Sequence, residues 1–195
     1  MSEKSNAKEL IVGTAARLFF SQGYHATGLN QIIKESNTPK GSLYHYFPQG
    51  KEELALECIQ TVDAYIMQKF EEIFAAHETT AEAIREFIYE TADEAEKSGF
   101  TGFYPFSFWA AVETSCISQQ LRTASQNVFA GWQDIIARHL MMDGVQETKA
   151  RETALLVISL MEGAMIISLT NQDKQPLVTA ADYLSVAAKN AKHNQ

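Results

Sequence analysis

Cysteine is scarce in this chain: its 195 residues include only Cys58 and Cys116. Two thiols so far apart in the sequence exclude the dense disulfide framework of a small secreted protein. Each lies within an apolar helical pattern, so we expect two buried, reduced thiols in a cytosolic protein. The alternative is a redox sensor, but nothing nearby in the sequence would lower the pKa of either thiol.

Long apolar runs are missing too. The first ten residues, MSEKSNAKEL, lack the apolar core of an export signal. The most apolar stretch, residues 154–169, is shorter than the roughly 20 residues that a membrane-spanning helix needs, and Glu162 lies in its middle. We therefore expect a cytoplasmic protein without a membrane partner, in which this stretch forms a buried core or interface helix.

The sequence also lacks the motifs of the common enzyme classes. It has no glycine-rich loop that could hold phosphates and no nucleophile elbow. Its five histidines show no metal-binding spacing of the H-E-x-x-H kind: His25, His45, His77, His139 and His193. A hydrolase built from scattered residues is the alternative, and no pattern supports it. We expect a protein that is not an enzyme and that holds neither a metal nor a cofactor.

Strand-like alternation with period two is rare, whereas apolar residues recur with period 3.6 along most of the chain. The apolar fraction of 46% and the charged fraction of 21% are those of an ordinary globular protein. These patterns predict an all-α fold with about nine helices and no sheet. We expect the helices over residues 6–22, 28–36, 39–47, 51–76, 80–98, 103–115, 118–143, 147–171 and 177–192.

The first three predicted helices form a small module. Gly23 is a natural stop for the first helix, and Thr27 is expected to cap the second. A tight turn at Asn37 and Thr38 leads into the third helix, where Thr38 is a possible cap. Two short helices joined by so short a turn form a helix-turn-helix, with the first helix as a third wall.

A long helix is expected to join this module to the rest of the chain. Neither glycine nor proline occurs between Gly50 and Gly99, and a capping box at Thr79 and Glu82 offers the first break. The predicted helix over 51–76 has apolar positions along its whole length, so it would form a rigid connection between residues 1–50 and the rest of the chain.

Residues 1–58 carry six basic and six acidic residues, so the net charge of −8 arises from residues 59–195. A neutral N-terminal part with a few well-placed lysines can bind DNA.

The third predicted helix has an apolar back and a polar front. On a helical wheel its apolar stripe consists of Pro39, Leu43, Tyr46 and Phe47. The outer arc consists of Lys40, Gly41, Ser42, Tyr44 and His45. These polar groups can bond phosphates and base edges, and an exposed glycine lets a partner approach the backbone closely. The alternative is an ordinary solvated face with a tolerated glycine.

Residues 18–54, LFFSQGYHATGLNQIIKESNTPKGSLYHYFPQGKEEL, resemble the signature of the TetR family of bacterial transcription regulators. The matching positions are an aromatic-Gly-Tyr pattern at 19–24, Thr27, Ile32–Ile33, Gly41, Leu43–Tyr44, Phe47 and Lys51–Glu52. The segments TGLNQIIKES and PKGSLYHYFPQGKE are similar to the LmrA/YxaF-like branch, which shares an extra residue before Lys51. The segment FTGFYPFSFWAA departs from the family pattern because it is far more aromatic.

The resemblance implies an all-helical homodimer, cytoplasmic and more typically a repressor than an activator. Residues 1–50 would bind operator DNA, and residues 51–195 would dimerise and enclose a small effector that releases the DNA. By position it assigns DNA contacts to Thr27, Asn30, Lys40, Gly41, Ser42, Tyr44, His45 and Lys51. The amides and dipole at the start of the long helix independently favour a phosphate near Lys51. The alternative is a helical ligand-binding or adaptor protein without DNA binding.

An aromatic cluster suggests where the effector binds. We expect a small hydrophobic or aromatic compound between residues 103–132 and 155–166. The candidates are Phe103, Phe106, Trp109, Glu113, Trp132, Met161, Glu162 and Met165. The alternative is that the aromatic residues are core and that the two carboxylates bond across helices, for instance to Arg122 or Arg138.

Overall fold

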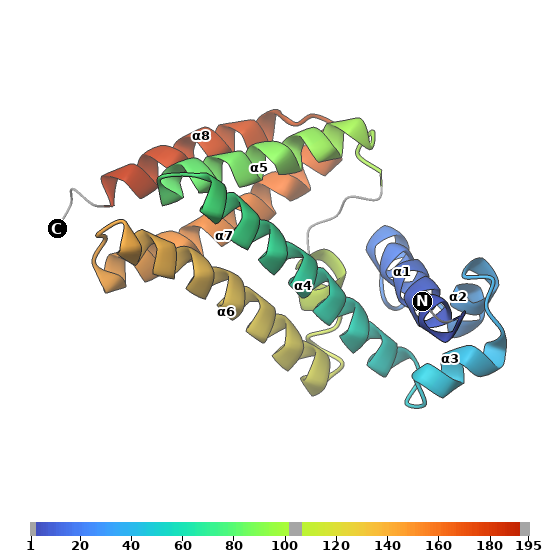
Figure 1. The fold of residues 1–195 in the computed structure, drawn as a ribbon. Coiled ribbons are helices and arrows are strands. Elements are labelled where there is room, and N and C mark those ends of the chain that lie inside the picture. Colours follow the sequence, from blue (N-terminus) through green and yellow to red (C-terminus); the bar gives the residue numbers. More distant parts are fainter. Residues whose placement is uncertain (1–2, 102–106, 192–195) are drawn as a thin grey trace. The chain divides into compact units, whose positions relative to one another are not determined.

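The computed structural model describes residues 3–101 and 107–191, and the side chains of residues 7–101 and 109–191 (Figure 1). Within these ranges every regular element is a helix, which confirms the predicted fold class. The helices are α1 (Glu3–Gln22), α2 (Leu29–Glu35), α3 (Lys40–Tyr46), α4 (Lys51–Ala76), α5 (Thr80–Lys97), the π-helix η1 (Ser107–Glu113), α6 (Gln119–Met142), α7 (Glu147–Asn171) and α8 (Gln175–Asn190).

The chain divides into two compact units. Unit 1 comprises Met1–Ala64 and Phe106–Gln126, and unit 2 comprises Tyr65–Pro105 and Asn127–Gln195. Helices α4 and α6 each contribute residues to both units. A segment from the second half of the sequence therefore belongs to the same compact unit as the three N-terminal helices.

The core of unit 1 forms where α1 meets α2 and α3. Four residues on one side of α1 are almost completely buried, as the helical pattern predicts: Ile11, Ala15, Leu18 and Phe19. Leu43 and Phe47 of the third helix are buried as well, so its apolar back is confirmed at these two positions. Tyr46 is half-buried, whereas Pro39 is exposed, so the prediction that Pro39 belongs to the stripe is wrong.

Two predicted helix caps are also wrong. The N-cap of α2 is Gly28, which has no side chain to accept a bond from the helix amides. The Thr27 hydroxyl instead donates to the carbonyl oxygen of Gly23 at 2.8 Å. The N-cap of α3 is Pro39, while the hydroxyls of Thr38 and Ser36 bond to each other at 2.7 Å. Each threonine satisfies a nearby loop group instead of the helix end, an alternative that short hydroxyl side chains commonly take.

The prediction of an α-helix over residues 103–115 needs a correction. The described part of this segment is a π-helix, Ser107–Glu113, and a turn follows it. The carbonyl oxygen of Ala110 accepts bonds from the hydroxyls of both Thr114 and Ser125, the second at 3.0 Å. Such side-chain bonds compete with the regular helical ladder. π-Helical turns are rare and often occur at functional sites.

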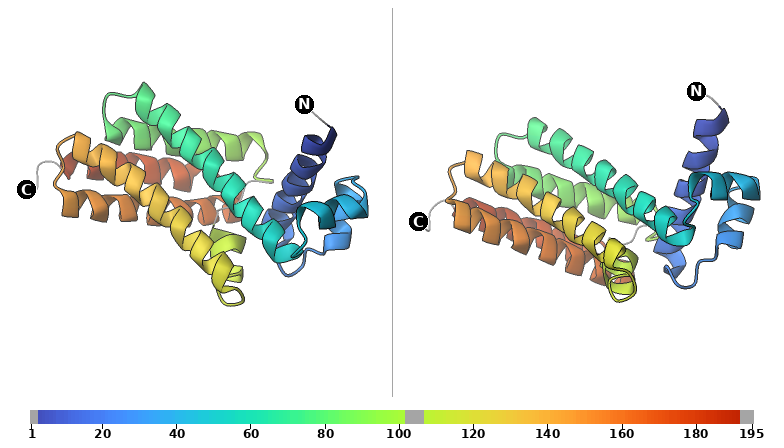
Figure 2. Two further views of the ribbon diagram at one scale, coloured as in Figure 1. Left: turned by 60° about the horizontal axis from the view of Figure 1, so that its bottom comes forward. Right: turned by 90° about the horizontal axis from the view of Figure 1, so that it is seen from below.

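Unit 2 is a helical body in which α8 packs against both α5 and α7 (Figure 2). The side chain of Thr79 accepts a bond from the backbone N–H of Glu82, so the predicted cap of α5 is present. An ion pair joins Arg85 of α5 to Asp182 of α8 at 2.9 Å. A second joins Asp93 of α5 to Lys174, the N-cap residue of α8, at 3.0 Å. These pairs are largely exposed, so the buried apolar faces contribute most of the stability.

Helix α7 contains the most apolar stretch of the chain. By length and composition alone it could cross a membrane, but half of its most apolar window is buried inside the protein. The buried residues include Glu162, Met161 and Met165. The core helix of a globular protein passes the same length and composition test, and α7 has the burial of such a helix, as predicted.

The two cysteines differ in their surroundings. Cys58 is buried in α4, where its thiol donates to the carbonyl oxygen of Val12 at 3.6 Å and burial raises its pKa. Cys116 is exposed, so the prediction that both thiols are buried is wrong for this one. The reason is that Cys116 lies in the turn between η1 and α6 and not within a helix.

Candidate nucleic-acid interface

The front of α3 is open to solvent. Lys40, Gly41, Tyr44 and His45 are exposed, and Ser42 is half-buried. The buried Leu43 and Phe47 fix the opposite side of the helix in the core of unit 1. The helix therefore presents a cation, a phenol, an imidazole and a hydroxyl on one accessible surface.

Gly41 lies within this surface, and nothing in the described protein requires a glycine there. A Cβ atom built at this position would have no heavy atom within 4 Å, and Gly41 is not among the glycines with positive φ. Alanine would favour the helix by about 1 kcal/mol relative to glycine. A glycine retained without an internal reason is consistent with an external partner that approaches the backbone.

Aromatic rings order the side chains around Gly41. The ammonium group of Lys40 lies 5.9 Å from the centroid of the Tyr44 ring, within the range of a cation–π contact. The His45 ring lies edge-on to Tyr46, with centroids 5.1 Å apart. These contacts lie along the exposed edge of a short helix, where polar groups are accessible to a nucleic acid.

Side-chain bonds connect α1 to α2, the other two helices of the N-terminal module. The side-chain amide of Gln22 donates to the side-chain oxygen of Gln31 at 2.8 Å. The side-chain amide of Gln31 in turn donates to the Glu35 carboxylate at 2.9 Å. Arg17 bonds the same Glu35 carboxylate at 2.5 Å, and the bonds from Arg17 and Gln31 lower the pKa of Glu35. Asn30, the predicted contact on α2, is exposed beside this chain of bonds.

Lys51 and Thr27, both expected to contact DNA, have different environments. Lys51 is half-buried at the start of α4, with its ammonium group 4.3 Å from the centroid of the Tyr24 ring. Burial lowers the pKa of Lys51, and the charge of Glu113 opposes that shift. Thr27 has no exposed surface, so the prediction that it contacts DNA is incompatible with this conformation. It shapes the turn before α2 instead.

The predicted effector residues fall into several groups. Phe103 and Phe106 lie outside the described residues. Trp109 is fully buried in unit 1, and the centroid of its ring lies 5.1 Å from that of Phe19 and 5.6 Å from that of Phe20. Four others are buried in unit 2: Trp132, Met161, Glu162 and Met165.

Glu113 does not bond to Arg122 as suggested. Its carboxylate accepts the backbone N–H groups of Tyr24 and His25, whereas Arg122 donates to the carbonyl oxygen of Ser115. The sequence singles out Glu113 as an unusual carboxylate, and its partners in the structure are backbone amides instead of an arginine. No local pattern in the sequence indicates an acceptor for amides so distant along the chain.

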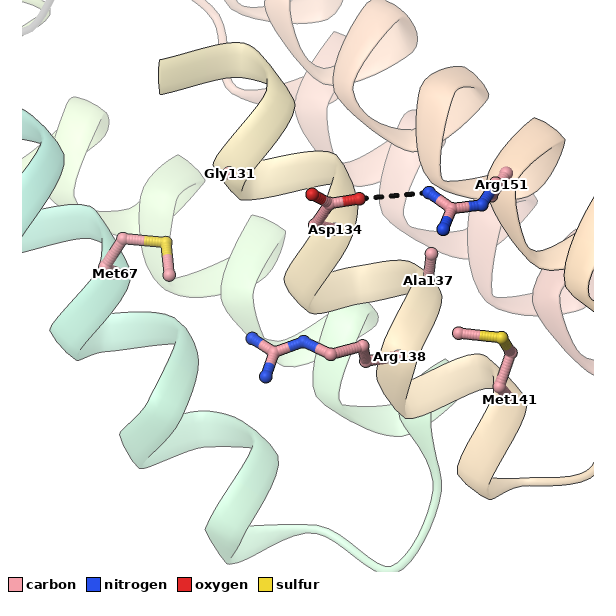
Figure 3. A pocket seen from close by; sticks show the side chains of 7 residues that line it. All are labelled: Met67, Gly131, Asp134, Ala137, Arg138, Met141 and Arg151. Carbon is pink, nitrogen blue, oxygen red and sulfur yellow. Dashed lines mark hydrogen bonds and ion pairs between the residues drawn. The ribbon is translucent and has the colours of Figure 1, made fainter. Parts of the chain in front are cut away.

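Pockets lined by described residues include four in which no predicted effector residue takes part. One of them has a volume of about 440 Å³ and lies between α4, α6 and α7 (Figure 3). Met67 and Met141 supply apolar walls, and Asp134 pairs with Arg151 at 3.1 Å. The side chain of Arg138 extends from α6 toward α4 in the same view.

A second pocket, of about 680 Å³, lies on α7 and α8. It belongs to a surface that is unusually rich in apolar side chains. The exposed members on these two helices are Leu155, Leu156, Ile166, Ile167, Tyr183 and Val186. Ile167 and Tyr183 line this pocket, and exposed apolar side chains gathered around a pocket are typical of an interaction site.

Two sequence families match the chain. The family described as "Bacterial regulatory proteins, tetR family" matches residues 11–58, and "Transcriptional regulator LmrA/YxaF-like, C-terminal domain" matches residues 80–183. The first match contains α2, α3 and the turn between them. The resemblance found in the sequence is thereby confirmed.

Individual proteins agree with these matches. The chain is 41% identical to the uncharacterized regulator YxaF of Bacillus subtilis over 97% of this chain and 98% of that one. It is 39% identical to the regulator LmrA of the same organism over 89% of this chain and 92% of that one. A TetR regulator from Chloroflexus aurantiacus has the same fold, with a TM-score of 0.82, 27% identity and coverage of 95% and 96%. This chain belongs to the TetR family of bacterial transcription regulators, in its LmrA/YxaF-like group.

Proposed function

We propose that this chain is a cytoplasmic repressor that binds operator DNA as a homodimer and releases it when a small effector binds. The observation that carries the DNA-binding part is the exposed face of α3 around Gly41. Its polar groups surround a glycine that the chain's own packing does not require. The family is one of transcription regulators, and no enzymatic step is part of the proposal.

The proposed contacts follow from exposure and chemistry. Lys40, Ser42, Tyr44 and His45 would contact base edges and phosphates in the major groove, and Asn30 would contact them from α2. Gly41 would let α3 sit deeply in the groove. Lys51 would hold a phosphate beside the first amides of α4, where the helix dipole adds to its charge. Residues 1–50 would thus form the DNA-binding domain.

The proposed dimer uses the apolar surface on α7 and α8, within residues 51–195. Side chains such as Ile167 and Tyr183 are more than half exposed, and burying them against a second copy would remove a large apolar area from water. A dimer is also what operator binding needs. Two recognition helices that read adjacent half-sites must lie about 34–36 Å apart, or a multiple of one DNA turn.

The proposed effector is a small hydrophobic or aromatic compound that binds within residues 51–195. The many aromatic residues around Trp109 and Trp132, both of which are buried, support this part of the proposal. The pocket of about 440 Å³ between α4, α6 and α7 is a second candidate location (Figure 3). An effector acts by binding more tightly to one arrangement of the two DNA-binding domains of the dimer. A thermal-shift screen of aromatic compounds, followed by gel shifts with each hit, tests this part of the proposal.

A gel shift with DNA from upstream of the protein's own gene tests DNA binding. Lys40→Ala and Tyr44→Ala should weaken binding, whereas Lys97→Ala should not, because Lys97 is exposed on α5 in unit 2. Lys40→Ala should also reduce the salt dependence by about one ion. No shift with the unaltered protein would favour the alternative of a helical ligand-binding or adaptor protein. Equal shifts by the unaltered protein and all three variants would contradict the proposed role of α3.

A further inference from the structure

Glu113 makes an unusual contact within unit 1. It is the last residue of η1, and its two carboxylate oxygens accept the backbone N–H groups of Tyr24 and His25 at 2.6 and 2.7 Å. These two amides are consecutive and follow the end of α1. Bonds from amides to an ionised carboxylate are short and stronger than bonds between neutral groups.

The turn is shaped to receive this carboxylate. Gly23 precedes the two amides and has φ +88°, a backbone conformation that residues with a side chain rarely adopt. A Cβ atom built on Gly23 would lie only 2.8 Å from the nearer carboxylate oxygen of Glu113. Glycine at this position therefore serves both the backbone conformation and the close approach of Glu113.

The same turn leads directly into the DNA-binding elements. The carbonyl oxygen of Gly23 accepts the hydroxyl of the buried Thr27, which is followed by the N-cap of α2. The Tyr24 ring lies against the ammonium group of Lys51 at the start of α4. A shift of this turn would displace both the start of the helix-turn-helix and the proposed phosphate contact.

Two further contacts hold the segment that carries Glu113. Trp109 packs on Phe19 of α1, and the hydroxyl of Ser118 donates to the Glu52 carboxylate at 2.5 Å. The segment is thus attached to α1 and to the start of α4. Its position is set by unit 1, to which it belongs despite its distance along the chain.

We propose that Glu113 is a positioning residue for operator binding, which it supports by holding the turn at Tyr24 and His25. This inference rests on the proposed DNA-binding function. Glu113 lies far outside residues 11–58, the range matched by the N-terminal family. It touches no DNA itself and acts through the turn before α2 and through Tyr24, against which Lys51 lies.

Glu113→Gln tests this role because it keeps the shape of the side chain and replaces one acceptor by a donor. We expect operator affinity to fall by about tenfold or more, since one charge-assisted bond is lost and the other weakened. Binding to unrelated DNA should fall much less, because it depends on the phosphate charge alone. Glu86→Gln, at an exposed carboxylate on α5, is the control with the same charge change.

Amide hydrogen exchange supplies a second readout that does not depend on DNA. The N–H groups of Tyr24 and His25 should exchange slowly in the unaltered protein, and at least one should exchange fast in Glu113→Gln. Equal operator affinity of the Glu113→Gln variant and the Glu86→Gln control would overturn the inference. Fast exchange of both amides in the unaltered protein would overturn it as well, and decides the matter if the variant does not fold. Failure of the unaltered protein to bind operator DNA would instead refute the proposed function.

Discussion

The ammonium group of Lys51 lies 4.3 Å from the centre of the Tyr24 ring, at the first residue of a 26-residue helix. The ring lies against one side of the cation, and Lys51 belongs to the first turn of the helix, where backbone amides lack intrahelical partners. Both the cation and the amides favour an anion at this point of the surface. The arrangement fits a phosphate contact at the edge of the helix-turn-helix.

Replacing Lys51 by glutamine should weaken operator binding and lower the slope of log affinity against log salt by about one. The reason is that one cation fewer displaces counterions from the DNA. Titrations at several salt concentrations measure this slope, with Lys97→Gln as the control. An unchanged slope for Lys51→Gln would show that Lys51 contacts no phosphate.

Gly41→Ala should separate stability from DNA binding. Because a Cβ atom at this position meets no other atom, the free energy of unfolding should rise by about 0.5–1 kcal/mol. Operator affinity should fall by about tenfold, because the added methyl group would lie between α3 and the groove. Gly13→Ala is the control, since Gly13 lies exposed in α1 with equally open surroundings. A Gly41→Ala protein that binds as well as the control would contradict the proposed deep seating of α3.

Ile167→Asp should convert a dimer into monomers, because it places a charge in the apolar surface of α7 and α8. Sedimentation or gel filtration at several protein concentrations measures the change. Ile117→Asp is a matched control, since Ile117 is 50% exposed and Ile167 is 52% exposed. If the Ile117 variant dissociates and the Ile167 variant does not, the dimer interface lies elsewhere.

His139 should make stability depend on pH. Its ring stacks on Phe74 with centroids 4.2 Å apart, and its pKa lies below the ordinary value of 6.5, first because of burial and second because of Arg138, with Asp143 opposing. Between the lowered pKa and 6.5 the unfolded chain binds more protons at this site, so stability should rise with pH across that window. Denaturant titrations at successive pH values measure this rise.

His139→Phe keeps an aromatic ring against Phe74 and removes the titrating group. The variant should therefore lose the part of the pH dependence that belongs to this site, and its stability should equal or exceed that of the parent at the acidic end. An identical pH profile of stability in the parent and the variant would mean that folding does not lower the pKa of His139.

The local character of the chain follows from the sequence. Period 3.6 predicts the helices, and the bounds of α4 and α7 agree with the prediction because glycine or capping residues flank both. Leu43 and Phe47 are buried and Gly41 is exposed, since the angle around a short helix depends only on spacing. The exposed polar surface of α3 could thus be predicted from ten residues.

Only the tertiary structure decided which partners distant residues find. Thr27 bonds the carbonyl of Gly23 instead of capping a helix, and Cys116 is exposed because a π-helix and a turn replace the expected regular helix. Glu113 bonds amides that lie nearly ninety positions away, a contact that no periodicity encodes. Helix patterns depend on neighbours a few residues apart, whereas polar side chains take the nearest unsatisfied group in space, which packing alone brings within reach.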